Sequence, residues 1–334
     1  MGLLIDMLKV GQGGSLLLTL EGSGREFTWL IDGGPLSSGD EVADFVRKYA
    51  NGHLDVVIGT HLDNDHLGGL QTVVEQCDFD YFYLNLPPDV HKAFEHLHRQ
   101  RLYEFKKSGF VWDILEKSLK TGSDLYDAVR AKDKTPLAIV AGASWTNGTD
   151  IQINVLNPNP ARLGEAWGVL EKEETVLEQL LKDLNKSTID EAPETSAENN
   201  ASVVLEIWFE GAPYALLPAD AGAQVLREVT AGKKYPFLKV PHHGSKTGLD
   251  EELIKQFQSR TAYISVGDNG YGHPAEEILD MLHDVGASTF CSHKTEYCYD
   301  DCPIGGFGNI CHLVKRPSRP NWTALDPRKC RNNA

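Results

Sequence analysis

Short apolar runs near the start of the chain predict a β-sheet. Four runs rich in Leu, Ile and Val are bounded by turns and have the length of strands: 3–10, 15–20, 27–31 and 55–60. Apolar residues recur at helical spacing in 40–49 and 67–76, on either side of the fourth run. This order of elements predicts the α/β half of a sandwich whose loops gather on one edge.

A helical period replaces this pattern between residues 87 and 198. Apolar residues recur at helical spacing in three stretches, which predicts three inserted helices: 90–97, 111–119 and 170–184. A strand pair at 138–141 and 151–156 is expected to rejoin the core, and the polar run 185–200 to form a flexible connector. We therefore expect one domain, 1–334, with a mainly helical insertion at 87–198 that packs on the sandwich or forms a lid or partner platform.

Four side chains that can bind metal follow the fourth predicted strand within six residues: His61, Asp63, Asp65 and His66. A turn between strand and helix often contains Asp or Asn for backbone reasons, but it needs no histidines. Imidazole nitrogens and carboxylate oxygens together suit Zn, Mn or Fe. The segment therefore predicts a divalent metal site at the end of a buried strand.

Two later strand ends carry the same chemistry. One apolar run ends just before Asp220, and another ends just before His242 and His243. A lone Asp is usually a cap or turn residue, and a lone His is usually structural. Three strand ends with matching side chains instead predict one centre, in which Asp220 bridges two ions and a histidine completes the second.

Five motifs follow one another along the chain: 10–13 with 30–34, 61–66, 199–202, 239–246 and 271–274. They read V-G-Q-G with L-I-D-G-G, H-L-D-N-D-H, N-N-A-S, K-V-P-H-H-G-S-K and Y-G-H-P. This ordered set resembles the metallo-β-lactamase superfamily, and within it the nuclease-type domain of the ComEC competence proteins. That subgroup has Asp where most of the superfamily has a second histidine, and Asp63 takes this place.

The resemblance implies a metallo-β-lactamase-type αββα sandwich that holds two divalent ions, Mn or Zn. We expect the metal ligands to divide as follows: His61 and Asp63 on one ion, Asp65, His66 and one of His242 or His243 on the other, and Asp220 between them. The catalytic candidates are Asp65, His273 and Lys246, and the candidates for contacting substrate phosphate are Ser245 and Asn200. His273 would contact a phosphate oxygen, protonate the leaving group, or have a structural role.

Two positions depart from the pattern of that family. Acidic residues usually flank its G-Q-G loop, but Lys9 and Gly14 stand there in this chain. Asn199 or Asn200 lies near the place of the third-motif histidine of the superfamily. The loss of a nitrogen ligand predicts a weaker first metal site, so a single-metal or Mn-preferring enzyme stays open.

Composition and charge limit the possible partners. The formal net charge is −16, which argues against a broad surface for duplex nucleic acid, although bound metal ions would reverse the local potential. Much of the acidic excess lies in 165–198, away from the motifs. No apolar run approaches the roughly 20 residues of a membrane span, and the first residues lack the features of a signal peptide. We therefore expect a cytoplasmic location and no membrane partner.

Five of the six cysteines lie after residue 290, in an expected C-terminal extension at 288–334. In a cytosolic chain, such crowding favours a metal site over disulfides. A structural zinc would be held by Cys291, Cys298, Cys302 and Cys311, and the alternatives are free thiols or a redox pair.

The sequence thus predicts a metal-dependent hydrolase, a phosphodiesterase or nuclease that cleaves DNA or RNA with a water activated by metal. Two alternatives stay open. One is hydrolysis of a small phosphodiester such as a cyclic nucleotide. The other is a role as a subunit of a larger complex, in which the insertion binds a protein partner.

Overall fold

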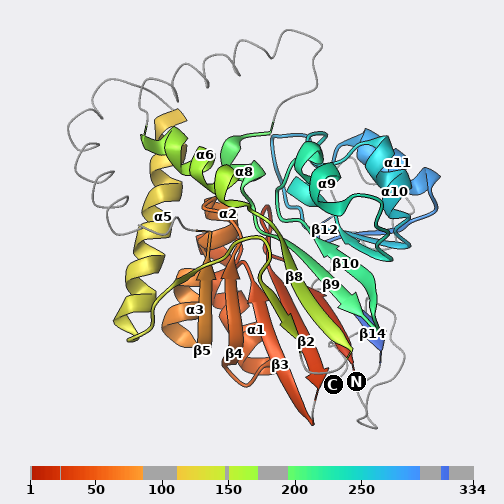
Figure 1. Ribbon diagram of the computed structural model, residues 1–334. Helices are drawn as coiled ribbons and strands as arrows, with labels where there is room; N and C mark the ends of the chain where they lie inside the picture. Colours follow the sequence, from red (N-terminus) through yellow and green to blue (C-terminus); the bar gives the residue numbers. More distant parts are fainter. Residues whose placement is uncertain are drawn as a thin grey trace.

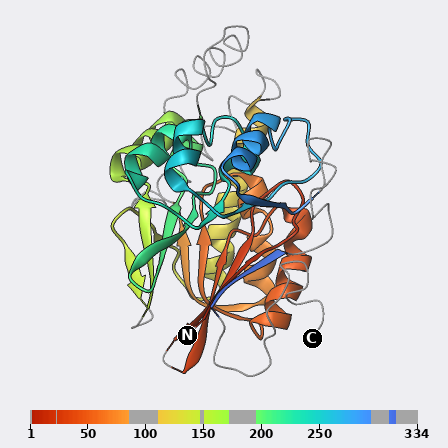
Figure 2. The same cartoon turned by 90° about the vertical axis from the view of Figure 1, so that its right-hand side faces the viewer.

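Two seven-stranded sheets face each other in the computed structural model of the chain, and helices cover the outer face of each sheet (Figures 1 and 2). The residues that the structure describes are 2–22, 24–85, 111–146, 150–171, 195–293 and 310–315. The αββα layering expected from the sequence is therefore confirmed.

The first sheet has the strand order β14-β1-β2-β3-β4-β5-β6. Its strands are β14 (Ile310–Lys315), β1 (Leu3–Met7), β2 (Leu16–Gly22), β3 (Arg25–Ile31), β4 (His53–Gly59), β5 (Asp78–Leu84) and β6 (Leu137–Ala138). β1, β2 and β3 pair antiparallel, whereas β3 to β6 run parallel. The helices between the first parallel strands are α1 (Gly39–Tyr49), α2 (Asn64–Leu67) and α3 (Leu70–Gln76). The four strands and two helices predicted before residue 80 thus occur, although β1 ends at Met7 instead of residue 10 and the helix predicted over 67–76 begins at Leu70.

The second sheet has the order β13-β12-β11-β10-β9-β8-β7. Its strands are β13 (Ser288–Cys291), β12 (Thr261–Ile264), β11 (Phe237–Lys239), β10 (Ala212–Leu217), β9 (Val204–Phe209), β8 (Ile151–Asn157) and β7 (Ser144–Thr146). β10 to β13 are parallel, and the helices that connect them are α9 (Ala223–Thr230), α10 (Glu251–Phe257) and α11 (Glu276–Asp284). The carboxyl ends of these strands and of β1, β3 and β4 meet at one edge of the sandwich, which places the metal-binding motifs together.

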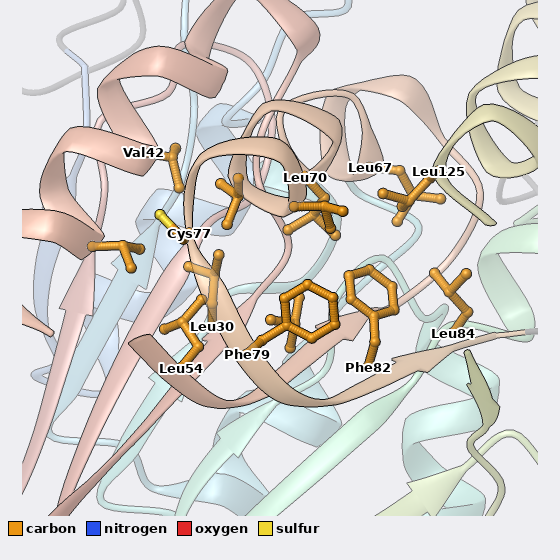
Figure 3. Close-up of a cluster of buried hydrophobic side chains, with 14 of the residues drawn as sticks. Leu30, Val42, Leu54, Leu67, Leu70, Cys77, Phe79, Phe82, Leu84 and Leu125 are labelled. Carbon is orange, nitrogen blue, oxygen red and sulfur yellow. The ribbon is translucent and has the colours of Figure 1, made fainter. Parts of the chain in front are cut away.

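Three apolar layers hold the sandwich together. Side chains on β2 alternate between two of them: Leu17 faces the helices, and Leu16 and Leu18 face the second sheet. The layer under α1, α3 and α5 (Val111–Ala131) includes Phe79 and Phe82 (Figure 3). Because both faces of the central strands are covered, their sequences are almost continuously apolar.

The region 87–198 contributes to both sheets. The second inserted helix occurs as α5, and α6 (Pro160–Glu171) reaches the start of the third, whereas 90–97 lies outside the described residues. The predicted pairing of 138–141 with 151–156 is wrong, because β6 joins β5 in the first sheet and β7 pairs with β8 in the second. The chain crosses between the sheets in this interval, with the amide of Gly142 donating to the carbonyl of Val155.

The end of the predicted flexible connector is also a correction. Residues 197–200 form the short helix α8 (Ala197–Asn200), whose N-cap Ser196 accepts a hydrogen bond from the amide of Asn199. Asn199 is buried against the core. Within the described parts of the chain, no helix has the length and apolar composition needed to cross a membrane.

Gly69 illustrates how tightly the loops at this edge pack. Its amide donates to the carbonyl of Gly34 at 2.8 Å, and a Cβ on Gly69 would lie 2.0 Å from the carbonyl oxygen of Gly33. Both contacts are between backbone atoms, so no rotamer change can relieve the clash. We expect Gly69→Ala to lower the free energy of unfolding by roughly 1–3 kcal/mol, measured by urea titration.

Gly164 provides the matched control. It lies within α6, and a Cβ there would meet no heavy atom within 4 Å. Gly164→Ala should therefore leave the free energy of unfolding unchanged or raise it by up to about 1 kcal/mol. Equal stability of the two variants would contradict the close approach at Gly69.

Candidate metal centre

The segment from His61 to His66 is a strand end followed at once by a helical turn. β4 ends at Gly59, and Asp63 is the N-cap residue of α2 but makes no side-chain cap hydrogen bond. Its carboxylate is instead 3.6 Å from Nε2 of His61. The turn of α2 then presents Asp65 and His66, and the imidazole of His66 is buried.

Four imidazoles share one arrangement, in which Nδ1 contacts a neighbour and Nε2 approaches a carboxylate. The Nδ1 contacts are His61 to Thr60 Oγ1 at 3.0 Å, His66 to Asp32 Oδ2 at 2.7 Å, His242 to Thr247 Oγ1 at 3.1 Å and His243 to the carbonyl of Ser265 at 2.8 Å. Metal-binding histidines usually have such a partner on the second nitrogen, because it fixes the ring and raises the basicity of the first. The orientation of all four rings therefore suits metal binding through Nε2.

Asp220 stands at the centre of these imidazoles. Its Oδ1 is 3.3 Å from Nε2 of His66, and its Oδ2 is 3.4 Å from Nε2 of His243. The same Oδ2 is 3.9 Å from Nε2 of His61 and 3.9 Å from Nε2 of His242. The carboxylate of Asp220 thus approaches all four imidazoles, and its role as a bridge between two ions stays a prediction.

Two overlapping groups of residues could each hold an ion: His61, His66 and Asp220, and Asp65, His66 and His243. Within each group, the ligand atoms lie within 4.8 Å of one another. His66 belongs to both groups, and a single imidazole nitrogen binds one ion. Nε2 of His243 is 3.3 Å from Asp65, which places His243 with the second group.

Buried polar atoms test whether a metal fits. Nε2 of His61 and Oδ1 of Asp220 are buried and have no hydrogen-bond partner. Oδ1 of Asp220 approaches His66, but without hydrogen-bond geometry. Buried polar atoms without partners are destabilising, and a divalent cation would satisfy both. The mixed nitrogen and oxygen donors suit Zn or Mn, so these residues fit a divalent metal.

Charges within the cluster shift the pKa values of its members. Burial acts to lower the pKa of His243, but Asp220 and then Asp65 outweigh it and raise the pKa to about 9. Burial likewise opposes the effect of Asp220 and Asp32 on His66, whose pKa rises well above its usual value. A metal and a proton therefore compete for the same nitrogen, so metal binding releases protons.

The carboxylate of Asp32 contacts both ends of the segment from Thr60 to His66. Asp32 follows β3, and its Oδ1 accepts a hydrogen bond from the amide of Thr60 at 2.8 Å. Its Oδ2 accepts from Thr60 Oγ1 at 2.7 Å and faces Nδ1 of His66 at 2.7 Å. The sequence analysis includes Asp32 in the L-I-D-G-G motif but predicts no role for it. The signal that could have indicated its role is an Asp at the end of a buried strand, directly before two glycines.

The loop that carries His242 and His243 is held in an uncommon backbone conformation. The φ angles are 48° at His242 and 55° at His243, and Ala219 beside Asp220 has φ 48°. Left-handed conformations are unfavourable for such residues and are retained when the surroundings impose them. Here the amide of His242 donates to the carbonyl of Ala219 at 3.0 Å, which joins this loop to the Asp220 loop.

The G-Q-G loop packs against the metal-binding helix. The amide of Gly14 donates to the carbonyl of Asp65 at 3.1 Å, and a Cβ on Gly14 would lie 2.7 Å from Cε1 of His66. An acidic side chain, which the related family has at this position, has no room here unless His66 moves. Oε1 of Gln12 accepts from the amide of Gly267 at 3.2 Å, so the loop also connects the two sheets.

Some predicted site residues lie beside the cluster or away from it. His273 lies beside it, with its ring centroid 5.6 Å from that of His242, and burial and the neighbouring His242 lower its pKa to about 4.

Lys246 is exposed and pairs with Glu277 at 2.5 Å. Ser245 Oγ contacts Thr247 Oγ1, and the side-chain Nδ2 of Asn200 donates to the carbonyl of Thr195. The roles assigned to Lys246, Ser245 and Asn200 stay predictions.

Glu198 was missed by the sequence reasoning. It lies on α8 at the end of the acidic run, and burial followed by the charge of Asp63 raises its pKa. The end of this run therefore reaches the centre, which corrects the expectation that it lies away from the motifs. Its one signal in the sequence was its position directly before the N-N-A-S motif at 199–202, although only the fold brings α8 to the loop after β4.

The predicted zinc ligands are described only in part. Cys291 ends β13 of the second sheet and is buried in the apolar layer under α10 and α11. Cys311 lies on β14 of the first sheet, where it is paired with Asp6 of β1. Cys298 and Cys302 lie outside the described residues. The structural zinc stays a prediction.

We expect Asp32→Asn to weaken metal binding on the order of 10- to 100-fold, because one acceptor oxygen becomes an NH2 group facing Thr60 or His66. Competition with a chromophoric chelator at fixed pH measures this. Asp55 provides the control, since its carboxylate also accepts a backbone amide, that of Thr28 at 2.7 Å, but at the opposite end of β4. Asp55→Asn should leave metal affinity unchanged, and unchanged affinity in both variants would mean that Asp32 does not orient His66.

Comparison with known proteins agrees with this geometry. The family model of the metallo-beta-lactamase superfamily matches residues 9–138. ComE operon protein 3 of Bacillus subtilis (strain 168) is 27% identical over 300 residues, which cover 83% of this chain and 30% of that protein. The chain thus spans under a third of the length of this relative.

Two solved structures of metal-dependent hydrolases are also similar. A candidate enzyme from Parabacteroides distasonis is 13% identical, with a TM-score of 0.41 and coverage of 86% of this chain and 92% of that chain. Igni18, a metallo hydrolase from Ignicoccus hospitalis, is 11% identical, with a TM-score of 0.36 and coverage of 87% and 83%. The family match contains the whole His61 to His66 segment and agrees with the motifs and the layered fold: residues 9–138 of the chain match the metallo-β-lactamase superfamily.

Proposed function

We propose that the protein is a metal-dependent phosphodiesterase that acts as a nuclease. The observation that carries this proposal is the convergence of four imidazole Nε2 atoms on Asp220, with Asp63 and Asp65 beside them. Bound divalent ions at such a centre lower the pKa of a water and neutralise the charge that develops on a phosphoryl group. The resemblance of the motifs to a nuclease-type domain supports the same substrate class.

The open side of the cluster favours a polymeric substrate. The side chains of His61 and His66 are 1% and 2% exposed, whereas those of Asp63 and Asp65 are 40% and 34% exposed. The cluster is thus closed toward the sheets and open toward the loops. A cavity lined in part by Arg25, Asp55 and Tyr81 lies at the opposite ends of the strands. Because it is remote from the candidate centre, it does not provide a pocket for a small phosphodiester there.

The distances also suggest how the ligands divide between two ions. His66 and His243 lie with Asp65, and the proximity of His61 to Asp63 defines the other side. Nε2 of His242 and of His61 are equidistant from Oδ2 of Asp220, at 3.9 Å. We infer that His242 completes the first site, whose third-motif histidine is missing. His243 is then the ligand of the second site.

Asp63 bears on the choice of metal. Its carboxylate replaces an imidazole with a harder oxygen donor, which favours Mn over Zn relative to a histidine-rich site. His273 is neutral at neutral pH because its pKa is about 4. Of the roles considered for it, a hydrogen bond to a phosphate oxygen therefore fits better than protonation of a leaving group.

The described part of the insertion packs on the proposed site. Thr121 Oγ1 of α5 donates to Oδ1 of Asn64 at 3.2 Å, in the turn that carries Asp65 and His66. We propose that 87–198 supports this turn. A platform for a protein partner, a distinct C-terminal extension at 288–334 and a cytoplasmic location stay predictions.

Replacing Asp65 and His66 together by Ala should abolish phosphodiester hydrolysis without unfolding the protein. Both belong to one group of candidate ligands, so the double variant removes most of the second site. Hydrolysis of labelled single- and double-stranded DNA, RNA, a cyclic nucleotide and bis-p-nitrophenyl phosphate would be measured with Mn, Zn or Mg, with circular dichroism to monitor folding.

A matched pair of Asp and His residues supplies the control. His53 and Asp80 are 3.4 Å apart and about half exposed, at the opposite ends of β4 and β5. Replacing both by Ala should leave hydrolysis unchanged. Full turnover in the Asp65 and His66 variant would overturn the assignment, and hydrolysis of the cyclic nucleotide alone would favour the small-substrate alternative.

A further inference from the structure

Tyr271 is an exposed aromatic residue beside the metal centre. Its side chain is 75% exposed, more than any other large hydrophobic residue in the described parts of the chain. The ring centroid is 5.9 Å from that of His273, at an interplanar angle of 31°. The His273 ring is in turn 6.5 Å from His243, at 23°. Three rings therefore lead from the ligand cluster to the solvent at similar tilts.

The loop that carries Tyr271 is held by one side chain. Oδ1 of Asn269 accepts from the amides of Tyr271 at 3.0 Å and His273 at 3.1 Å. Its Nδ2 donates to the carbonyls of Gly267 at 2.9 Å and His273 at 2.8 Å. These four hydrogen bonds fix the backbone on both sides of Tyr271. A ligand that contacts the ring therefore has little loop entropy to overcome.

Charge gives little help in binding a phosphodiester chain at this surface. The chain has a net charge of −16, and the ammonium group of Lys246 is already paired with Glu277. Binding through many phosphate contacts needs an excess of cations. Stacking on an aromatic side chain is independent of charge, and every base has a face that can stack.

We propose that Tyr271 is a stacking platform for an unpaired base of a nucleic acid whose phosphate lies at the metal centre. This inference rests on the proposed nuclease function and narrows it to single-stranded substrates. In a duplex, both faces of an internal base are covered by its neighbours, so the ring has no free face to contact. Stacking of this kind changes affinity about 5- to 150-fold.

The test compares two variants on two substrates. The substrates are a labelled single-stranded oligodeoxynucleotide and a chain of the same length made of abasic tetrahydrofuran residues. Tyr271→Leu removes the ring and should lower kcat/KM on the base-bearing strand by about 5- to 150-fold, with no change on the abasic strand. Tyr271→Phe keeps the ring and should retain activity close to that of the wild type. An equal loss on both substrates, or no loss on either, overturns the platform.

Binding measured without hydrolysis separates this inference from the proposed function. Fluorescence anisotropy of the same labelled strands in the presence of chelator measures binding without cleavage, and the difference between the base-bearing and abasic strands reports on stacking. If the wild type cleaves neither strand with any metal but Tyr271→Leu still weakens binding of the base-bearing strand, the proposed function fails and the platform stands. If the wild type cleaves the strand and Tyr271→Leu binds and cleaves it equally well, the platform fails and the nuclease stands.

Discussion

The proposed centre depends on one buried carboxylate, that of Asp32. It is buried at the end of β3, and a charge in such a position is unfavourable unless it is fully hydrogen-bonded. The amide and hydroxyl of Thr60 and the ring of His66 meet that need. Because Thr60 Oγ1 also contacts His61, the same carboxylate orients both histidines of the 61–66 motif. The same hydrogen bonds therefore stabilise the buried charge of Asp32 and set the orientation of His61 and His66.

The second sheet completes the centre through backbone contacts. Ser265 at the end of β12 orients His243 through its carbonyl and donates through its hydroxyl to the carbonyl of Gly13 in the G-Q-G loop. The left-handed conformation of His242 and His243 is held against the Asp220 loop. The candidate ligands thus come from both sheets and are fixed by contacts between loops, which requires the close packing seen at Gly14 and Gly69.

The sequence predicted what depends on local pattern. Apolar runs and helical spacing located the elements before residue 80, and the unusual density of His and Asp in 61–66 indicated the candidate centre. It failed where a contact joins distant segments. The pairing of β6 with β5 reflects a crossing between sheets, and the approach of Glu198 to Asp63 depends on where α8 docks. A short apolar run does not indicate which of the two sheets its strand will join. Likewise, the partners of Asp32 are known only once β3 and β4 lie side by side.

The central claim is that these imidazoles and carboxylates hold divalent metal. Anomalous diffraction from crystals of the protein grown with Mn tests it directly, because the signal locates the ion without reference to activity. We predict anomalous density between Asp220 and Nε2 of His66 and His243, with any second peak on the side of His61 and His242. His53, Asp55 and Asp80 form a third group of possible ligands, at the opposite end of β4. Density only at that group, or none at millimolar Mn or Zn, would contradict the account.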